Sequence, residues 1–244
     1  MLQGMYSNEF QKIIEHRRSN RKFDPAVAVP EEVITRSLER AILSPNSSNM
    51  QLWEFYWIHS EEEKKRFGDL CLGQSAAKTA QEMVVFVTRK DLWKKRAKWN
   101  QSKISEAAQG ESDKLIKRGL DYYGKVMPLA YGNDPFGVLT FVRRTICFFA
   151  GLKKPFMRMG GKADQRVTVH KSCALAAQTF MLSIAAEGFE SCPMEGIDAW
   201  RIRRALNLPW GAEINMVIAV GKGTEEGIWG PRFRVPYEEV VFKR

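Results

Sequence analysis

The stretch that decides the fold lies at residues 44–53 and reads Ser44-Pro45-Asn46-Ser47-Ser48-Asn49-Met50-Gln51-Leu52-Trp53. Small polar side chains fill its first eight positions, and it separates a helix that Pro30 opens from an aromatic strand. Such a loop can wrap a polar cofactor with its backbone N–H groups and side-chain amides. It can equally be a turn in which Asn and Ser side chains cap the neighbouring backbone. The residues alone leave both interpretations open.

Helices and strands alternate along the rest of the chain. Apolar residues with helical spacing predict helices over 8–17, 30–43, from 61 onward and over 169–187, which Gly188 would cap. Apolar or aromatic runs predict strands over 52–59, 83–88 and 214–220. The strand at 83–88 shows no polar alternation, so we expect it to be buried on both faces.

Three further segments are less regular. Residues 91–123 are charged and poor in Gly and Pro, which favours helix and indicates an insertion or lid. Residues 141–152 fit either a strand or a buried helix. Residues 236–242 are expected to form an extended tail.

The composition is typical of a soluble globular protein. The 244 residues are 44% hydrophobic and 27% charged, which suits one large domain and argues against disorder. No apolar run approaches the roughly 18 residues that cross a bilayer, and the start lacks the pattern of a secretory signal. We therefore expect a cytoplasmic protein without a membrane partner. The four cysteines and three histidines lack metal-ligand spacing, which predicts reduced, buried thiols and no metal site.

Positive charge is concentrated in the middle of the chain. Residues 89–118 contain ten Lys and Arg but only four Asp and Glu, and residues 143–171 contain eight Lys and Arg but only one Asp. The whole chain has a net charge of +10. No nucleic-acid recognition motif accompanies this basicity. Two explanations of the positive charge remain. The lysines and arginines could form a solvated surface, or they could form an electropositive rim that attracts an anionic ligand.

Two basic clusters carry arginines two residues apart. If the chain is extended after the first helix, Arg17, Ser19 and Arg21 point to one side, because side chains alternate along a strand. Two guanidinium groups and a hydroxyl suit a phosphate. The cluster can also be explained without a ligand: basic side chains at the C-terminal end of a helix interact favourably with the helix dipole, or they are simply solvated. Arg232 and Arg234 form the second pair, which is also consistent with an exposed tail.

A fourth cluster runs from Ser191 to Asp198, between a long helix and a short one. Pro193 fixes φ and Gly196 permits close approach of the backbone, so the segment can present main-chain N–H groups to a flat ligand. A plain turn between helices is the alternative.

In this order and separation, the four clusters resemble the FMN-dependent nitroreductase family. The family's basic-Ser-x-basic opening is similar to Arg17-Arg18-Ser19-Asn20-Arg21, and its Ser-Pro-Ser-x-x-Asn-x-Gln-Pro-Trp loop is similar to residues 44–53. Its Pro-x-Glu-Gly turn resembles Pro193-Met194-Glu195-Gly196, and its late basic pair resembles Arg232 and Arg234. The chain departs from the loop pattern at Leu52, where proline is usual, and at Asn46, where serine is common.

The resemblance implies an α+β, three-layer fold with a central, mainly antiparallel sheet flanked by helices, in an intertwined homodimer. It implies a single domain over residues 1–244 with a variable basic helical insertion or lid at about 90–165. It also implies an FMN-dependent oxidoreductase in which NADPH or NADH is the co-substrate. By a ping-pong mechanism, electrons then pass to a small electron-poor acceptor such as a nitroaromatic or a quinone. Because FMN carries this chemistry, we expect no catalytic side chain.

The resemblance also implies roles for individual residues. The residues that would hold the phosphate and ribityl end of FMN are Arg17, Ser19, Arg232 and Arg234, with Arg18 beside them. Two side chains would lie near the pyrimidine edge of the ring: Arg21 and Gln74. The turn that would face flavin N5 and O4 comprises Pro193, Met194, Glu195 and Gly196. The loop residues that would reach the FMN of the other subunit are Pro45, Asn46, Ser47 and Asn49.

Other functions fit the same residues. On the same fold, the chain could carry out another flavin reaction, such as reductive dehalogenation or flavin breakdown. A flavin-binding protein without turnover, or a nucleic-acid binder that uses the basic middle segment, belongs to a different class.

Overall fold

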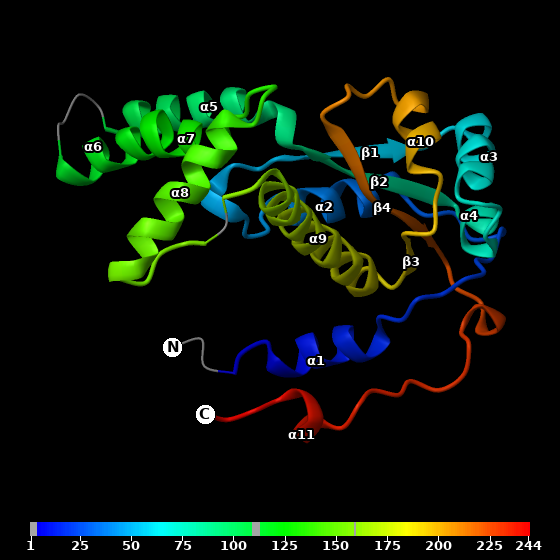
Figure 1. The fold of residues 1–244 in the computed structure, drawn as a ribbon. Helices are drawn as coiled ribbons and strands as arrows, with labels where there is room; N and C mark the ends of the chain where they lie inside the picture. Colours follow the sequence, from blue (N-terminus) through cyan, green and yellow to red (C-terminus); the bar gives the residue numbers. More distant parts are fainter. Residues whose placement is uncertain (1–3, 109–112, 159) are drawn as a thin grey trace.

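Four strands pair into one sheet in the computed structural model, which describes residues 4–108, 113–158 and 160–244 (Figure 1). They are β1 (Trp53–Ile58), β2 (Glu82–Arg89), β3 (Glu190–Met194) and β4 (Ala212–Gly221). Their order in the sheet is β1-β2-β4-β3, and each neighbouring pair is antiparallel. The expected strand at 83–88 is therefore central, and all of its residues are buried.

Helices cover both faces of this sheet. On one face lie α3 (Glu61–Leu70), α4 (Ser75–Thr79) and α10 (Ala199–Ala205); on the other lie α2 (Glu31–Ile42) and α9 (Lys162–Ala186). Met83 and Val85 of β2 point into the first core, whereas Val84 and Phe86 point into the second, because successive side chains alternate. The expected α+β fold, with an antiparallel sheet between helices, is confirmed.

A β-bulge keeps both cores filled along β4. Phe86 pairs with Met216 but Val87 pairs with Ile214, which leaves Asn215 as the extra residue. Ile214 therefore shares the first core with Val217 although three positions separate them. The Asn215 side-chain amide donates to the carbonyl of His170 at 3.3 Å and so ties the bulge to α9.

Helices make up most of the described chain between β2 and α9. This helical segment comprises α5 (Trp93–Ala107), α6 (Lys114–Asp121), the π-helical turn η3 (Tyr122–Val126), α7 (Met127–Tyr131) and α8 (Val138–Lys153). A third, smaller core joins this segment to the loop before β1, and includes Met50, Leu52, Ala97, Met127 and Val169. The expectation of helix over 91–123 is confirmed in α5, α6 and η3, while residues 109–112 of that range lie outside the described residues; 141–152 is a helix rather than a strand. None of the described helices is both long and apolar enough to cross a bilayer.

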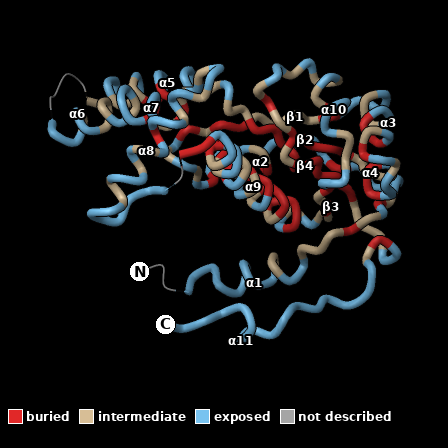
Figure 2. The backbone as a smooth tube through the Cα atoms, viewed as in Figure 1, coloured by how far each residue is buried: buried red, intermediate tan, exposed pale blue. Residues whose placement is uncertain are grey.

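Helix α1 (Ser7–His16) and the C-terminal segment, residues 231–244, run side by side, apart from the sheet (Figures 1 and 2). Every residue of α1 (Ser7–His16) is at least partly exposed, and residues 231–244 are exposed throughout. The Arg232 guanidinium donates to the carbonyls of Ile14, Glu15 and Arg17, at 3.1, 2.9 and 2.7 Å. One tail arginine thus caps the C-terminal end of α1.

Three elements differ from the sequence-based expectations. Helix α9 begins at Lys162 rather than at 169, because the Asp164 carboxylate accepts a hydrogen bond from the N–H of Gly161 and caps the start. Residues 190–194, expected as the start of a turn, form β3; it lies at the edge of the sheet, where Pro193 is tolerated without an N–H. The tail contains a short helix, α11 (Tyr237–Val240).

The cysteines match the expectation of reduced, buried thiols at three positions. Cys71, Cys173 and Cys192 are buried, Cys147 is half-buried, and all four are free. Burial raises the pKa of Cys71 and of Cys173 to about 12. Burial also raises the pKa of Cys192, an effect that the nearby positive charge of Arg21 partly offsets.

Two arginines of α2 hold the end of α9. Glu187, the residue that follows α9, accepts hydrogen bonds from Arg36 at 3.2 and 2.9 Å and from Arg40 at 2.8 Å. These bonds, led by that of Arg36, hold the pKa of Glu187 below its ordinary value. A carboxyl whose pKa is depressed in the folded state stabilises the protein above its unfolded pKa, and loses that contribution as the pH falls through the folded pKa.

We predict that Glu187→Gln lowers the free energy of unfolding by about 1 kcal/mol at pH 7. The difference from the wild type should shrink as the pH falls below about 4.3, the unfolded pKa of glutamate. Urea denaturation at several pH values measures it. Glu39→Gln, an exposed change on α2, is the control and should have a smaller effect at pH 7. A difference that persists unchanged at pH 2 would contradict the assignment.

Candidate functional site

A cavity of about 200 Å³ brings together the first and last basic clusters of the sequence. We call it the arginine pocket, and its lining residues are Arg17, Arg18, Ser19, Arg21, Trp229, Pro231, Arg232, Phe233 and Arg234. Among the described residues, no Asp or Glu lines it. Positive charges gathered without a carboxylate indicate a site for an anion.

Residues 17–21 are positioned by the edge strand β3. Ser19 forms a parallel bridge with Ser191, and the N–H of Asn20 donates to the carbonyl of Ser191 at 3.2 Å. The N–H of Arg21 donates to the carbonyl of Gly227 at 2.8 Å, which brings the tail segment alongside. This extended path places Arg17, Ser19 and Arg21 on the pocket together.

Arg18 departs from the expected alternation. A strand would turn it away from Arg17 and Ser19, yet it also lines the pocket. Its guanidinium donates to the carbonyl of Gly230 at 2.8 Å, and this contact with the tail directs the side chain.

The arginines in the pocket differ in what they already contact. Arg232 is engaged with the carbonyls at the end of α1, and one nitrogen of Arg234 donates to the carbonyl of Phe233 at 2.7 Å. Arg17 is half-buried, and its pKa is lowered by burial and then by the charges of Arg232 and Arg234. A guanidinium that is partly desolvated among other cations gains most from a bound anion.

Three lining residues were not among the predicted site residues: Trp229, Pro231 and Phe233. The Arg21 guanidinium lies over the indole ring of Trp229, 4.2 Å from the ring centroid. This cation–π contact fixes the direction of Arg21. The signal was the position of Trp229, three residues before the late arginine pair.

The turn after β3 lies on the same edge of the sheet. Met194 is buried, whereas Glu195 and Gly196 are exposed. Within the described part of the chain, the backbone N–H groups of Glu195 and Gly196 donate no hydrogen bond to protein. Gln74 reaches this turn from the chain before α4, where its side-chain amide donates to the carbonyl of Gly196 at 2.8 Å and to that of Cys71 at 3.0 Å.

The polar loop before β1 is held in an uncommon backbone conformation. Ser48, Asn49 and Gln51 have φ angles of +54°, +48° and +48°, in the left-handed region that side chains other than glycine disfavour. Inside the loop, the side-chain oxygen of Asn46 accepts from the N–H of Gln51 at 2.8 Å. Pro45, Ser47 and Asn49 are exposed.

Side chains from the helical segment hold this loop. Asn100 of α5, only 4% exposed, donates to the carbonyl of Asn49 at 3.0 Å and accepts from its side-chain amide at 3.2 Å. The Tyr123 hydroxyl donates to the carbonyl of Ser48 at 2.9 Å, and the Tyr122 hydroxyl lies 2.6 Å from the Ser48 hydroxyl. The sequence offers no local signal for these contacts, because they join segments about 50 and 75 residues apart.

The loop and the arginine pocket lie at opposite corners of the sheet. The loop leads into Trp53 of β1, which pairs with Thr88, whereas Ser191 of β3 pairs with Val220 and so lies level with Glu82. The two edge strands are three strand spacings apart, about 14 Å, and the two levels differ by six residues, about 20 Å. Within one chain, the four predicted clusters therefore form two separate groups (Figure 1).

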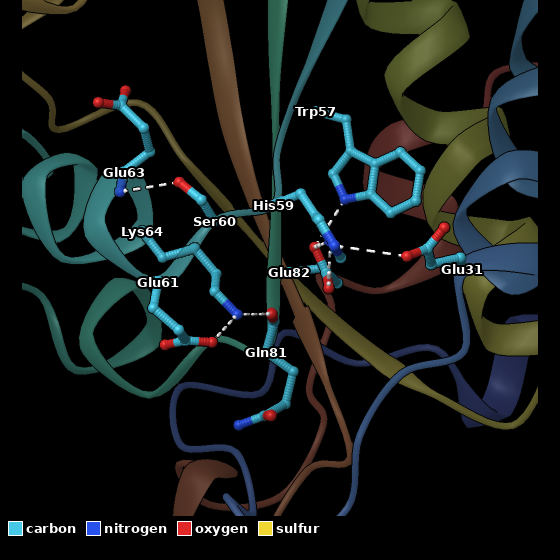
Figure 3. A network of polar contacts seen from close by, with 9 residues as sticks. All are labelled: Glu31, Trp57, His59, Ser60, Glu61, Glu63, Lys64, Gln81 and Glu82. Carbon is cyan, nitrogen blue, oxygen red and sulfur yellow. Dashed lines mark hydrogen bonds and ion pairs between the residues drawn. The ribbon is translucent and has the colours of Figure 1, made fainter.

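A second cavity, of about 560 Å³, lies at the other end of β1. Figure 3 shows its polar side chains, which satisfy one another. The carboxylate of Glu82 accepts from Trp57 at 2.6 Å and lies 3.2 Å from a His59 nitrogen, and the Lys64 ammonium contacts Glu61 at 2.6 Å. The polar side chains of this cavity are thus bonded to one another, and its described lining residues include three glutamates but no cluster of cations like that of the arginine pocket.

The whole arrangement matches one known family. The family model described as "Nitroreductase family" matches residues 14–222, which include the loop, the turn after β3 and the start of the arginine pocket. The chain belongs to the nitroreductase family.

Similar nitroreductase-family proteins span almost the same length. The chain is 28% identical over 230 residues to an NADH dehydrogenase of Thermus thermophilus, covering 93% of this chain and 92% of that protein. It is 27% identical over 236 residues to YdgI of Bacillus subtilis, a candidate NAD(P)H nitroreductase, with 96% and 97% coverage. A structure from Exiguobacterium sibiricum, solved in complex with FMN, has a TM-score of 0.66 at 22% identity, with 96% and 97% coverage.

We predict that Asn100→Ala lowers the free energy of unfolding by about 2 kcal/mol, because it leaves the carbonyl and amide of Asn49 without partners. Amide hydrogen exchange over residues 46–51 should become faster at the same time. Ser102→Ala on the exposed side of α5 is the control and should change neither. Unchanged exchange in the loop would show that Asn100 does not hold it.

Proposed function

We propose that this nitroreductase-family chain is an FMN-dependent oxidoreductase that uses NADH or NADPH to reduce a small electron-poor acceptor such as a nitroaromatic or a quinone. The observation that carries the proposal is the arginine pocket, a set of guanidinium groups without a carboxylate at the edge of the sheet. The names of the Thermus and Bacillus relatives support a nicotinamide co-substrate, and the FMN complex of the Exiguobacterium structure supports FMN.

The residues present fit this cofactor. Arg17, Arg18 and Arg234, with the hydroxyl of Ser19, would bind the phosphate through charge-assisted hydrogen bonds. The buried hydroxyl of Ser191, beside Ser19, has no partner among the described residues and so leaves a polar group at the pocket edge to be satisfied. Arg232 acts differently: it holds α1 and the tail together, and so shapes the pocket.

The turn after β3 would orient the flavin ring. The free N–H groups of Glu195 and Gly196 would donate to its polar edge, with Pro193 and Met194 fixing the turn and Gln74 bracing Gly196. Arg21, held by Trp229, would present positive charge near the pyrimidine edge. Bound FMN supplies hydride acceptance and electron transfer to the acceptor. No catalytic side chain is assigned.

The site is proposed to be completed by a second copy of the chain. At about 200 Å³ the arginine pocket is smaller than the roughly 300–1,000 Å³ of pockets that bury a whole ligand of this kind. The loop residues Pro45, Asn46, Ser47 and Asn49 lie at the opposite corner of the sheet, so in a two-fold dimer they would reach the partner's FMN.

In such a dimer, the helical segment α5–α8 would lie against the partner subunit together with the loop. Because Asn100 and Tyr123 hold the loop, this segment is proposed as a variable lid of the single domain, set over the site of the other subunit.

We predict that Arg17→Gln and Arg234→Gln each weaken FMN binding by about tenfold, or about 1.4 kcal/mol, because each removes a donor to the phosphate. Riboflavin, which lacks the phosphate, should lose less than about threefold. Fluorescence quenching of each flavin measures both affinities. Arg66→Gln, an exposed arginine on α3 that pairs with Glu63, removes the same charge elsewhere and should change neither. Equal losses for FMN and riboflavin would place these arginines against the ring.

We predict that the protein sediments as a dimer, and that FMN at about 100 times its dissociation constant raises the melting temperature by about 5–10 °C. Binding to the native state alone would stabilise it by about 2.7 kcal/mol, and each kcal/mol is worth about 2–4 °C in a chain of this size. Analytical ultracentrifugation and thermal unfolding test the two parts. A stable monomer with FMN bound would contradict the shared site.

A further inference from the structure

Two arginines of helix α10 place their guanidinium groups on exposed tryptophans. The Arg204 guanidinium lies 4.7 Å from the ring centroid of Trp200, and that of Arg203 lies 4.4 Å from the ring centroid of Trp210. Trp200, Arg203 and Arg204 share one face of the helix, because residues three and four positions apart are neighbours on a helix. We call these four residues the α10 strip.

The tryptophans of the α10 strip remain largely in solvent. Trp200 is 53% exposed and Trp210 is 83% exposed, although a guanidinium covers one face of each ring. The other face of each ring is therefore open to a second flat group. Exposed aromatic side chains that lie together, rather than singly, mark an interaction site.

The two arginines of the α10 strip are not neutralised. In the part of the chain that the structure describes, neither Arg203 nor Arg204 forms an ion pair; they contact the indole rings and, for Arg203, the carbonyl of Trp210 at 3.4 Å. Nearby carboxylates are bonded to other cations: Asp198 to Arg201 at 2.6 Å, Glu63 to Arg66 at 3.1 Å, and Asp91 to Arg89 at 2.8 Å. The strip thus offers free positive charge to an anion.

The positive charge does not extend beyond the α10 strip. Glu62 and Asp69 on α3, and Glu195 in the turn that leads to α10, are exposed carboxylates on neighbouring elements. Their negative charge would repel a long anionic chain that ran across this side of the protein. The strip therefore suits a ligand with one or a few anionic groups, rather than an extended polyanion.

The proposed dimer leaves the α10 strip uncovered. Ile202 of α10 packs into the first core, on the face of the sheet opposite α9. Both groups of flavin-site residues are attached on the α9 side: the N–H of Ser47 donates to the Ser172 hydroxyl of α9 at 3.2 Å, and α1, whose end Arg232 caps, contacts α9. A second copy that completes the flavin sites would cover that side. Figure 1 shows α10 beside α3, away from α1 and the C-terminal segment.

We propose that the α10 strip binds a nucleotide, either free or in a short single-stranded segment, with the base on an open indole face and the phosphate on a guanidinium group. Guanidinium binds phosphate through two parallel charge-assisted hydrogen bonds. Bases of any kind stack on aromatic side chains, and a neighbouring arginine adds a cation–π contribution. An acidic peptide would engage the guanidinium groups but leave the indole faces unused. The strip is independent of the proposed FMN site.

Equilibrium dialysis of the full-length protein, loaded with one equivalent of FMN per chain, tests the proposal. The probes are AMP and a single-stranded tetraadenylate; adenosine, which lacks the phosphate, and inorganic phosphate, which lacks the base, are the comparison ligands. The wild type should bind AMP or the tetraadenylate at least about tenfold more tightly than either comparison ligand, and more weakly as the salt concentration rises. Tighter binding of the tetraadenylate identifies a strand as the source of the nucleotide, whereas AMP binding that is equal or tighter identifies a free nucleotide.

Substitutions in the strip separate stacking from charge. Trp210→Ala should weaken binding of the preferred probe by about tenfold, and Arg203→Gln should do the same while reducing the salt dependence. Trp210→Phe, which keeps a ring for stacking, should stay within about threefold of the wild type. Trp99→Ala is the matched control, because Trp99 is a 43% exposed tryptophan on α5, and it should change nothing. Circular dichroism confirms that each variant retains the fold.

Three results would overturn the proposal. The first is that the wild type binds neither AMP nor the tetraadenylate at low salt, and the second is that Trp210→Ala and Trp99→Ala bind them equally well. The third is that Arg17→Gln abolishes binding while Arg203→Gln does not, because the probe then occupies the arginine pocket. If tetraglutamate binds in place of the adenylates, the strip instead docks an acidic protein segment.

Discussion

The antiparallel pairing of β2 with β4 is the interaction on which the rest of the structure depends. It places two apolar strands at the centre of the sheet, where Val84 and Val85 face opposite cores. Helices must then cover both faces, and β1 and β3 become the two edges. The polar loop enters at the first edge and the arginine segment pairs with the second. The distance between the two groups of site residues is therefore a consequence of strand order, not of side-chain packing.

The arginine pocket shows how cations are kept together without counter-charges. Arg232 gives its donors to the carbonyls at the end of α1, Arg18 binds the carbonyl of Gly230, and Arg21 lies over the ring of Trp229. Each of these neutral partners directs a guanidinium without neutralising its charge. An Asp or Glu in the same place would neutralise the pocket and compete with an anionic ligand. The cavity around Glu82 and His59 differs, because carboxylates line it and bond to neighbouring side chains such as Trp57 and Lys64.

The local sequence pattern predicted the structure correctly where burial or the alternation of side chains along a strand determines it. It did not predict features that depend on contacts between side chains far apart in the sequence. The unbroken apolar run of β2 identified the central strand, and the spacing of Arg17, Ser19 and Arg21 identified one side of the pocket. Pro193 obscured β3, because proline is compatible only with an edge strand and strand order is not visible in the sequence. Residues 141–152 were ambiguous because their apolar side chains face outward and form no stripe toward a core. The contact of Asn100 with Asn49 depends on tertiary placement alone.

The burial of the cysteines has a consequence for their chemistry. Peroxides and electrophiles attack the thiolate, and burial raises the pKa of Cys71 and Cys173, so both side chains stay in the thiol form near neutral pH. Sulfenic acid formation at these two sites is therefore suppressed by burial, with no need for a protective partner. The core therefore keeps its cysteines unreactive by burial alone, whereas Cys147 on α8 is half-buried.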